Sequence, residues 1–386
     1  MSPQTSTALR QCYFWLYGFL GIWGTLLGSY LEGLDFTGLQ IASIIACTPI
    51  ASIFIPPLWG MLADRMGNAT LPLQLALFGS AIFLIPLPWI KTFGVMLVLY
   101  ALFALFRAGT GALLDSISLS TIETEGGDYG RIRLFGSVGF LVFGMGVAFS
   151  ADTFGDHMII WGMVVVQGAA ALSSLLLPKT RRVPSKHYLE NVRTLFARRG
   201  FALFIFTSFL SQLAMGPAMI FYPIHLKATG STNAVVSAFW CVGVAAEVLF
   251  LNYAGSLQKK VGWGTLYLLS IAGLLIRFGP LLYVDHVVPV LALQCLHALT
   301  FGAFFYVCIH FARASAPETL QASAQTLFAA IVFGLANGMG ILISGSIYDH
   351  FGIQGVLVMS VSIAGLTLGF AVPTARYIDE LLSNQK

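Results

Sequence analysis

The chain alternates between long apolar runs and short polar segments along its whole length. We distinguish twelve apolar runs, each about 20 residues long, which is the length an α-helix needs to cross a hydrocarbon core roughly 30 Å thick. The pattern predicts an all-α membrane protein with twelve transmembrane helices, because a transmembrane barrel would show shorter segments of alternating hydrophobicity. The predicted spans are 12–31, 39–61, 71–90, 95–119, 134–151, 157–177, 201–222, 234–255, 264–284, 288–312, 323–346 and 353–373.

The longest polar stretch divides the predicted spans into two sets of six. We therefore expect an N-terminal six-helix half over 1–177, a cytoplasmic central loop over 178–200 and a C-terminal six-helix half over 201–386. A short repeat supports two related halves. The pattern Gly–x–Leu–x–x–basic–x–Gly occurs at Gly60–Gly67, after the second span, and again at Gly255–Gly262, after the eighth.

Composition and charge agree with a membrane protein of defined orientation. The chain is 57% hydrophobic and only 9% charged, whereas soluble proteins carry about 25% charged residues. If both termini are cytoplasmic, sixteen of the twenty Lys and Arg residues lie in cytoplasmic segments, and only Lys91 and Lys227 lie in external ones. Since positive charge concentrates on the cytoplasmic side, we expect a multi-pass inner-membrane protein with both termini inside.

Several ionisable residues fall within the apolar spans, where charge is unfavourable. A charged side chain at the bilayer centre costs roughly 2.5–3.5 kcal/mol on insertion scales. Such residues in membrane spans are typical of solute pathways and proton relays. The candidates are Arg107, Asp115, Glu247, Arg277 and His297, with Arg133 at the start of the fifth span.

The segment Gly60–Gly67 is similar to the Gly-x-Leu-Ala-Asp-Arg-x-Gly signature of the major facilitator superfamily. The resemblance implies a secondary transporter with twelve helices in two halves that works by alternating access. It also implies that Asp64 and Arg65, between the two signature glycines, help to latch one conformation. The basic residues that usually follow the signature are replaced here by Asn68 and Ala69.

A second resemblance is narrower. The segment Tyr129–Phe140 resembles the start of the fifth span in the branch that holds lactose permease and the phenylpropionate transporters. In that branch an acidic residue lies 18 positions before the second arginine of the segment. The branch also has a glutamate in span eight, an arginine in span nine and a histidine 20 positions later. The matching residues here are Asp115, Arg133, Glu247, Arg277 and His297.

This resemblance implies roles for the matched residues. We expect proton coupling to involve Glu247, His297, Arg277 and Asp115, and we expect solute binding to involve Asp115, Arg133, Arg277 and His297. Proton coupling needs a group whose charge changes near physiological pH, which histidine or a desolvated carboxylate provides. We predict direct Asp115–Arg133 and Glu247–Arg277 pairs near the membrane midplane, with His297 adjacent, because paired buried charges compensate each other.

Departures from the branch bear on the substrate. Lactose permease has a glutamate three residues after the histidine, where this chain has Thr300, and a tryptophan where this chain has Phe140. A phenyl ring still stacks on a solute ring, so Phe140 remains a predicted binding residue. Leu296–Phe301 resembles the phenylpropionate transporters more closely, which implies an aromatic carboxylate. Arg107, followed by Gly111, loosely resembles a second superfamily signature linked to proton transfer, and we add Arg107 to the candidate binding residues.

Other interpretations remain open. The same residues fit purely structural ion pairs with a core histidine, and the transporter could instead be a sugar permease or an exporter. A membrane enzyme is disfavoured because the sequence has no His-Glu-x-x-His, nucleophile elbow or phosphate loop. A signalling receptor is disfavoured by the short loops. We expect no cofactor, metal or nucleic acid; the expected partners are a small solute, protons and the lipid bilayer, with a monomer as the working state.

Overall fold

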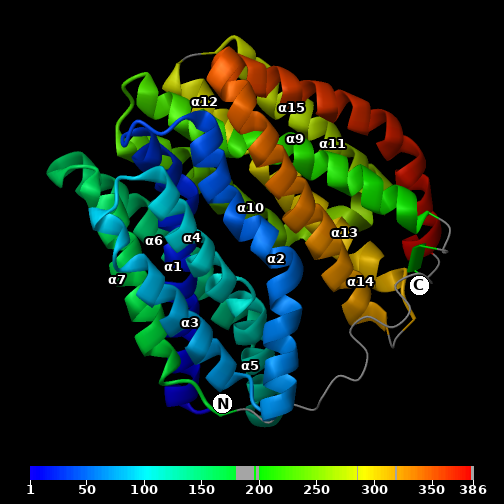
Figure 1. Ribbon diagram of the computed structural model, residues 1–386. Coiled ribbons are helices and arrows are strands. Elements are labelled where there is room, and N and C mark those ends of the chain that lie inside the picture. Colours follow the sequence, from blue (N-terminus) through cyan, green and yellow to red (C-terminus); the bar gives the residue numbers. More distant parts are fainter. Residues whose placement is uncertain (180–194, 197–199, 285, 318–319, 384–386) are drawn as a thin grey trace. The chain divides into compact units, whose positions relative to one another are not determined.

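The computed structural model describes residues 1–179, 195–196, 200–284, 286–317 and 320–383, and these residues are almost entirely helical (Figure 1). Most of the predicted central loop, 178–200, lies outside the described residues. The first set of α-helices comprises α1 (Pro3–Glu32), α2 (Gly38–Met66), α3 (Thr70–Leu84), α4 (Phe93–Arg107), α5 (Thr110–Glu125), α6 (Tyr129–Phe154) and α7 (His157–Ser174). The all-α prediction is thus confirmed for this part of the chain.

The second set begins with three long helices and continues with shorter pieces. It comprises α9 (Phe201–Ala228), α10 (Asn233–Val261), α11 (Trp263–Phe278), α12 (Val287–Gln294), α13 (Phe304–Ala314), α14 (Gln321–Phe328) and α15 (Asn337–Ser383). Two π-helical segments, η3 (Ala298–Ala303) and η5 (Ala329–Ala336), interrupt the last spans. Single turns of 3₁₀-helix, η1 (Leu87–Trp89) and η2 (Pro280–Leu282), follow α3 and α11.

Eleven helical stretches among the described residues are long and apolar enough to cross a membrane. The last of them, Ser323–Leu382, has 60 residues. At 1.5 Å per residue it would extend about 90 Å, roughly three times the hydrocarbon thickness. Its backbone is not helical at Gly352 (φ 60°, ψ −160°), between the predicted spans 323–346 and 353–373. The stretch therefore holds two spans, in agreement with the twelve that the hydropathy pattern predicts.

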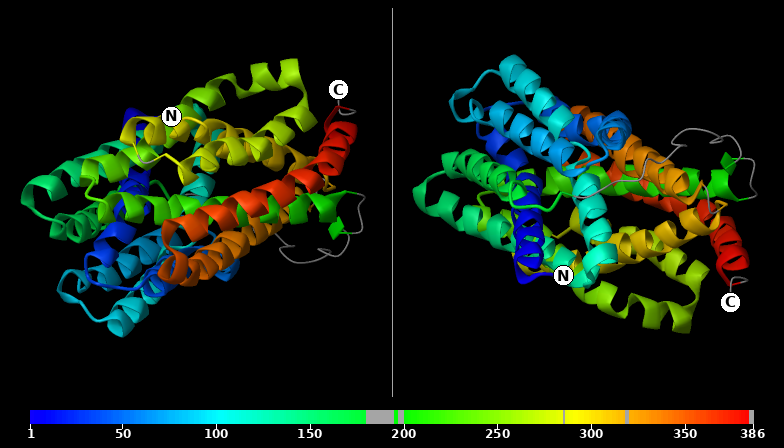
Figure 2. Two further views of the ribbon diagram at one scale, coloured as in Figure 1. Left: turned by 90° about the horizontal axis from the view of Figure 1, so that it is seen from above. Right: turned by 90° about the horizontal axis from the view of Figure 1, so that it is seen from below.

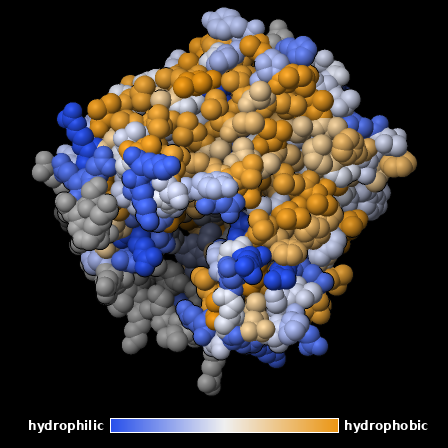
Figure 3. All heavy atoms as spheres, turned by 180° about the vertical axis from the view of Figure 1, so that it is seen from behind, coloured by the Kyte–Doolittle hydropathy of each residue, from blue (hydrophilic) through white to orange (hydrophobic). Residues whose placement is uncertain are grey.

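Large apolar side chains cover much of the protein's surface. Figure 3 shows many hydrophobic residues at the surface of one face. Phe54, Val165, Leu249 and Phe351 are 64–72% exposed. Soluble proteins rarely leave so many large apolar side chains open to water, whereas lipid tails cover them without cost.

The chain forms two compact units. Unit 1 holds the described part of Met1–Lys186 together with Pro223–Cys241, and unit 2 holds the described part of His187–Tyr222 together with Val242–Lys386. In unit 1, Asp152 at the end of α6 accepts hydrogen bonds from the backbone N–H groups of Asn233 (2.7 Å) and Ala234 (2.9 Å) at the start of α10. The boundaries predicted at 177 and 201 stay a prediction.

Within unit 1, α1 packs against α6 and α7, as Figures 1 and 2 both show. The approach of α1 to α6 is close enough to require glycine. A Cβ atom built on Gly139 of α6 would lie 2.0 Å from the carbonyl oxygen of Phe14 in α1, and one on Gly21 of α1 would lie 2.2 Å from that of Phe140. Small residues allow backbones to approach in this way where lipid gives no hydrophobic driving force between helices.

We expect Gly139→Ala to destabilise unit 1 strongly. The added methyl group meets backbone rather than a movable side chain, so α1 and α6 must separate and lose their packing. Overpacking of this severity should cost at least about 3 kcal/mol of unfolding free energy, measured by SDS titration of the purified protein. Gly146→Ala in the same helix is the control, because a Cβ there meets nothing within 4 Å. Equal stability of the two variants would contradict the packing described.

A cluster of buried aromatic side chains forms the core of unit 2. Phe204 of α9 lies 4.5 Å from Phe311 of α13 and 5.5 Å from Phe328 of α14, measured between ring centroids. Tyr267 of α11 and Phe304 of α13 are completely buried in the same cluster. This core fixes α11, which carries Arg277, against α13 and against η3, which directly follows His297.

Two helix boundaries add detail to the predicted spans. The predicted fourth span, 95–119, lies within the apolar helical stretch Phe93–Glu125, but this stretch has a break: α4 ends at Arg107, and α5 begins at Thr110 after Gly109 with φ 91°. The second span extends beyond the predicted residue 61, because α2 continues to Met66 and Gly67 ends it in the left-handed region (φ 60°). Asp64 and Arg65 therefore lie in the last helical turn.

Candidate functional site

The guanidinium of Arg277 is the centre of a polar group in unit 2. Arg277 lies near the end of α11 and is fully buried. Its Nε and Nη2 donate to Gln294 Oε1 (3.1 and 2.7 Å), its Nη1 donates to His297 Nδ1 (2.9 Å) and Thr300 Oγ1 (2.9 Å), and its Nη2 also donates to the Met219 sulfur (3.0 Å). These contacts use all five N–H donors that a guanidinium carries.

The contact with Arg277 determines how His297 is protonated. A guanidinium only donates, so Nδ1 of His297 must accept and carries no proton. The proton of the neutral ring then lies on Nε2, which is 3.5 Å from Oε2 of Glu247. Glu247, His297 and Arg277 thus form a chain in which the imidazole presents a donor to the carboxylate and an acceptor to the guanidinium.

Local structure explains why Glu247 and His297 meet. Gly243 and Glu247 are four residues apart on α10 and therefore share one face of the helix. A Cβ on Gly243 would lie 2.9 Å from Cβ of His297, so the glycine lets the two segments approach. His297 immediately precedes the π-helix η3, and such irregular turns are frequent at functional sites.

Burial of the side chains increases from Glu247 through His297 to Arg277. The side chain of Glu247 is 18% exposed and that of His297 is 5% exposed, while Arg277 has no exposed surface. The Glu247 carboxylate is therefore the most exposed of the three groups, and the guanidinium is the most enclosed.

The predicted direct pair between Glu247 and Arg277 is not formed, because His297 lies between the two side chains. Among the described interactions, Glu247 contacts His297, and every donor of Arg277 is already used by other residues. Gln294, three residues before His297, takes the place next to the guanidinium that we had expected a carboxylate to occupy.

A second polar group surrounds Asp115 in unit 1. Oδ1 of Asp115 accepts hydrogen bonds from the hydroxyls of Tyr13 (2.6 Å) and Tyr129 (3.0 Å). The guanidinium carbon of Arg133 lies 3.8 Å from the ring centroid of Tyr17 and 5.7 Å from that of Tyr13. This is the geometry of a cation–π contact.

The predicted Asp115–Arg133 ion pair is therefore not formed in the structure described. Tyrosines from α1 satisfy the carboxylate and provide the face on which the arginine lies. Both units thus hold an acid and an arginine that are joined through a third side chain, tyrosine in unit 1 and histidine in unit 2.

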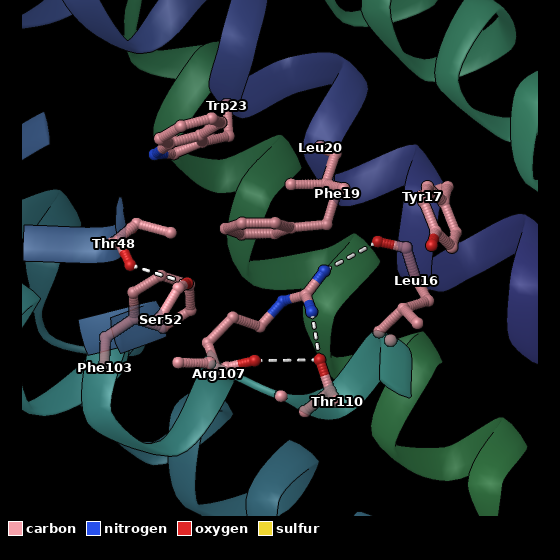
Figure 4. A pocket seen from close by; sticks show the side chains of 13 residues that line it. Leu16, Tyr17, Phe19, Leu20, Trp23, Thr48, Ser52, Phe103, Arg107 and Thr110 are labelled. Carbon is pink, nitrogen blue, oxygen red and sulfur yellow. Dashed lines mark hydrogen bonds between the residues drawn. The ribbon is translucent and has the colours of Figure 1, made fainter. Parts of the chain in front are cut away.

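Arg107 lies apart from the Asp115 group, at the end of α4. Its side chain is 7% exposed and lines a cavity of about 170 Å³ in unit 1 (Figure 4). Nη2 donates to the carbonyl of Leu16 (2.8 Å), and Nη1 donates to the hydroxyl of Thr110. The ring centroid of Phe19 is 5.2 Å from the guanidinium carbon.

The remaining predicted residues lie elsewhere. Phe140 is half-buried on α6, where its backbone carbonyl faces Gly21. In the predicted latch, Gly60 is buried, Asp64 is half-buried and Arg65 is exposed. Their predicted roles in binding and latching stay predictions. Within the ranges that the structure describes, no group of three or more His, Cys, Asp or Glu side chains is placed to hold a metal ion.

Sequence reasoning gave no role to Tyr129, Gln294 or Met219. Gln294 had a usable signal, because a polar residue three positions before His297 in an apolar span lies on the same helical face. Met219 is apolar and gives no such signal. Tyr129 was visible only as part of the segment that resembles the start of span five, and nothing in that segment shows that its hydroxyl reaches Asp115.

Comparisons with known proteins agree with this architecture. The "MFS_1 like family" matches residues 6–358. The chain is 30% identical to the "Uncharacterized transporter YwbF" of Bacillus subtilis (strain 168), with 92% of this chain and 91% of the relative covered. It is 26% identical to the "Maltose permease" of Geobacillus stearothermophilus (91% and 89% covered). It is 24% identical to the "Probable 3-phenylpropionic acid transporter" of Escherichia coli (strain K12), with 88% and 89% covered.

A solved structure shows the same fold. The nucleoside transporter NupG matches with a TM-score of 0.82 at 21% identity, and the match covers 96% of this chain and 98% of NupG. Fold and matches together define a multi-pass membrane protein that acts as a secondary transporter and not as an enzyme. The chain belongs to the MFS_1 like family, which confirms the resemblance to the major facilitator superfamily.

Proposed function

We propose that the protein is a proton-coupled symporter of a small organic anion, with an aromatic carboxylate such as a phenylpropanoate as the preferred solute. It acts by alternating access in the inner membrane, as a monomer with both termini in the cytoplasm. Solute binding involves Arg107, Arg133, Asp115 and Phe140. Proton coupling involves the three contacting side chains Glu247, His297 and Arg277.

The balance of charge in unit 1 supports an anionic solute. Arg107 and Arg133 contribute two guanidinium cations, and Asp115 contributes one carboxylate. Neither arginine has a carboxylate within ion-pair distance among the residues described, and Asp115 is held by two tyrosine hydroxyls instead. One positive charge is therefore left unbalanced in a weakly hydrated region, which disfavours the empty site and favours a solute of charge −1.

The Glu247–His297–Arg277 contacts in unit 2 support proton coupling. The three side chains contain one carboxylate, one neutral imidazole and one guanidinium, so their charges balance when Glu247 is ionised. Protonation of Glu247 removes its negative charge and weakens its interaction with Nε2 of His297, because a neutral carboxyl is a weaker acceptor than a carboxylate. The imidazole is then held less firmly, and its contact with Arg277 Nη1 weakens. We propose that this rearrangement couples proton binding to the conformational change.

Neutral solutes are the second candidate. The similarity to the maltose permease named above and to the nucleoside transporter NupG supports an uncharged solute that contains a ring. Tyr17 and Phe140 would stack on such a ring. In this case the excess positive charge in unit 1 would stay unbalanced, because Asp115 offsets only one of the two arginines. An exporter built on the same fold would bind the same solutes and move them outward.

The experiment that tests the proposal is a panel of solutes added to liposomes that contain the protein and a trapped pH indicator. We expect 3-phenylpropionate or a benzoate to acidify the interior, because each symport cycle carries protons inward with the anion. Nucleosides and disaccharides should give no change. Acidification with a nucleoside or a disaccharide alone would overturn the choice of solute, and solute exchange without any pH change would overturn the coupling.

A further inference from the structure

We infer that Arg107 binds the carboxylate of the solute, inside the cavity at the break between α4 and α5, and that the solute is a monocarboxylate with one ring or a short chain. The inference rests on the proposed function, because it names which of the three arginines receives the anion. It also limits the size of the solute.

The cavity is lined mostly by apolar and aromatic side chains, and Arg107 provides its one charged group. Tyr17, Phe19, Trp23 and Phe103 provide aromatic walls, and Thr48 and Ser52 add hydroxyl groups. Figure 4 shows the guanidinium of Arg107 facing the Phe19 ring, with Trp23 further along the same cavity. Such a lining suits a ring that carries a single anionic group.

Arg107 is unusually short of partners for a buried cation. It is 7% exposed, and two contacts, to Leu16 and Thr110, satisfy two of the five donors that a guanidinium has. Its Nε is buried without a partner, and no ion pair joins it to an acid in the described structure. A buried charge without a counter-ion is strongly unfavourable, so a bound carboxylate would stabilise this residue.

The start of α5 adds a second attraction for an anion. The 16-residue helix begins at Thr110 because Gly109 adopts φ 91°, which only glycine does readily. The first N–H groups of a helix have no partner within the helix and form the positive end of its dipole. Gly109, Thr110 and Gly111 line the cavity beside Arg107, so these donors and the guanidinium act on the same space.

The other two arginines are less suited to this role. Every donor of Arg277 is occupied, so a solute carboxylate would have to displace Gln294, His297 or Thr300. Arg133 lies on the ring of Tyr17 at 3.8 Å, and Tyr17 is itself a wall of the Arg107 cavity. A ring bound against Tyr17 therefore contacts the side chain that carries Arg133, which links the cavity to the Asp115 group.

The volume of the cavity restricts the solute. About 170 Å³ is well below the roughly 300–1,000 Å³ of pockets that hold drug-sized ligands. A benzoate or a phenylpropanoate is of the right order, and a disaccharide is not. We therefore expect the Arg107 cavity to select solutes by both their charge and their size.

The test compares an acid with its uncharged analogue. Calorimetric titration of the purified full-length protein with 3-phenylpropionate and with 3-phenylpropanamide should show that the wild type prefers the acid by at least about tenfold. Arg107→Gln should weaken binding of the acid by at least about 30-fold and leave binding of the amide nearly unchanged. The control is Arg131→Gln, an exposed arginine outside the cavity, which should bind both compounds like the wild type.

Two milder variants keep the test decisive if Arg107→Gln does not fold. Arg107→Lys retains the charge but loses the planar fork, so we expect about tenfold weaker binding of the acid. Thr110→Val removes the hydroxyl that positions the guanidinium, and we expect about two- to tenfold weaker binding. Unchanged affinity for the acid in Arg107→Gln and Arg107→Lys would overturn the role of Arg107 while leaving the proposed function intact. Failure of the wild type to bind any carboxylate would overturn both.

Discussion

Glu247→Gln is expected to abolish accumulation of the solute against its gradient while leaving exchange of solute across the membrane intact. Glutamine has nearly the same shape and still accepts a hydrogen bond from Nε2 of His297, so the chain to Arg277 is preserved. It cannot take up a proton, however. A pH difference of one unit is worth about 1.4 kcal/mol per proton, or about tenfold accumulation. The variant should therefore bring the internal concentration only to the external one.

Uptake and counterflow in liposomes, with and without a pH gradient, measure this effect. Glu123→Gln, at an exposed position near the end of α5, provides a matched control and should accumulate the solute like the wild type. If Glu247→Gln still accumulated the solute in response to the pH gradient, the proton would have to bind elsewhere, and the assignment of the coupling residue would be wrong.

Arg277→Lys should be almost as damaging, although it keeps the positive charge. The five donors of Arg277 contact four side chains in a fixed planar geometry, whereas an ammonium group is a compact point charge with three donors. Three donors on one nitrogen cannot serve the four acceptors on Gln294, His297, Thr300 and Met219, so at least one is left without a donor. A buried oxygen or nitrogen acceptor left in this way costs about 1–3 kcal/mol. We expect transport to fall by about 100-fold, which corresponds to about 2.7 kcal/mol.

The matched control is Arg313→Lys in the same unit. Nε of Arg313 donates to Gln321 Oε1 (2.9 Å) at an exposed position, where water replaces a lost hydrogen bond. Initial rates of proton-coupled uptake and thermal stability should both be close to the wild type in this variant. If Arg277→Lys transported as well as Arg313→Lys, the hydrogen bonds of Arg277 would have no part in the mechanism.

The spans were predictable from the sequence because a membrane imposes a single strong requirement. Every run long enough to cross the hydrocarbon appears as helix, including α9 over Phe201–Ala228 and α10 over Asn233–Val261. The break at Gly109 was not predictable from hydropathy, since glycine also occurs within continuous membrane helices. The π-helices η3 and η5 were hidden for the same reason, because they are as apolar as the α-helices around them.

The candidate residues were predictable to a different degree. Charge within an apolar span marked Asp115, Glu247, Arg277 and His297, and spacing indicated that the last two belong together; the 2.9 Å contact agrees. The direct ion pairs were wrong because neutral side chains intervene. Tyrosine hydroxyls and the Gln294 amide satisfy charged groups without carrying charge, so hydropathy and charge patterns do not distinguish them from core residues.

The central claim, proton-coupled symport of a small organic anion, is tested most directly by uphill uptake of labelled 3-phenylpropionate into liposomes that contain the protein, with the external medium one pH unit more acidic. Protein-free liposomes and the Glu247→Gln variant correct for passive entry of the neutral acid. At times before passive entry is significant, we expect the wild type to approach the about tenfold accumulation set by one proton per solute, while both controls stay well below it. Equal internal and external concentrations, or accumulation of a nucleoside in place of the acid, would contradict the claim.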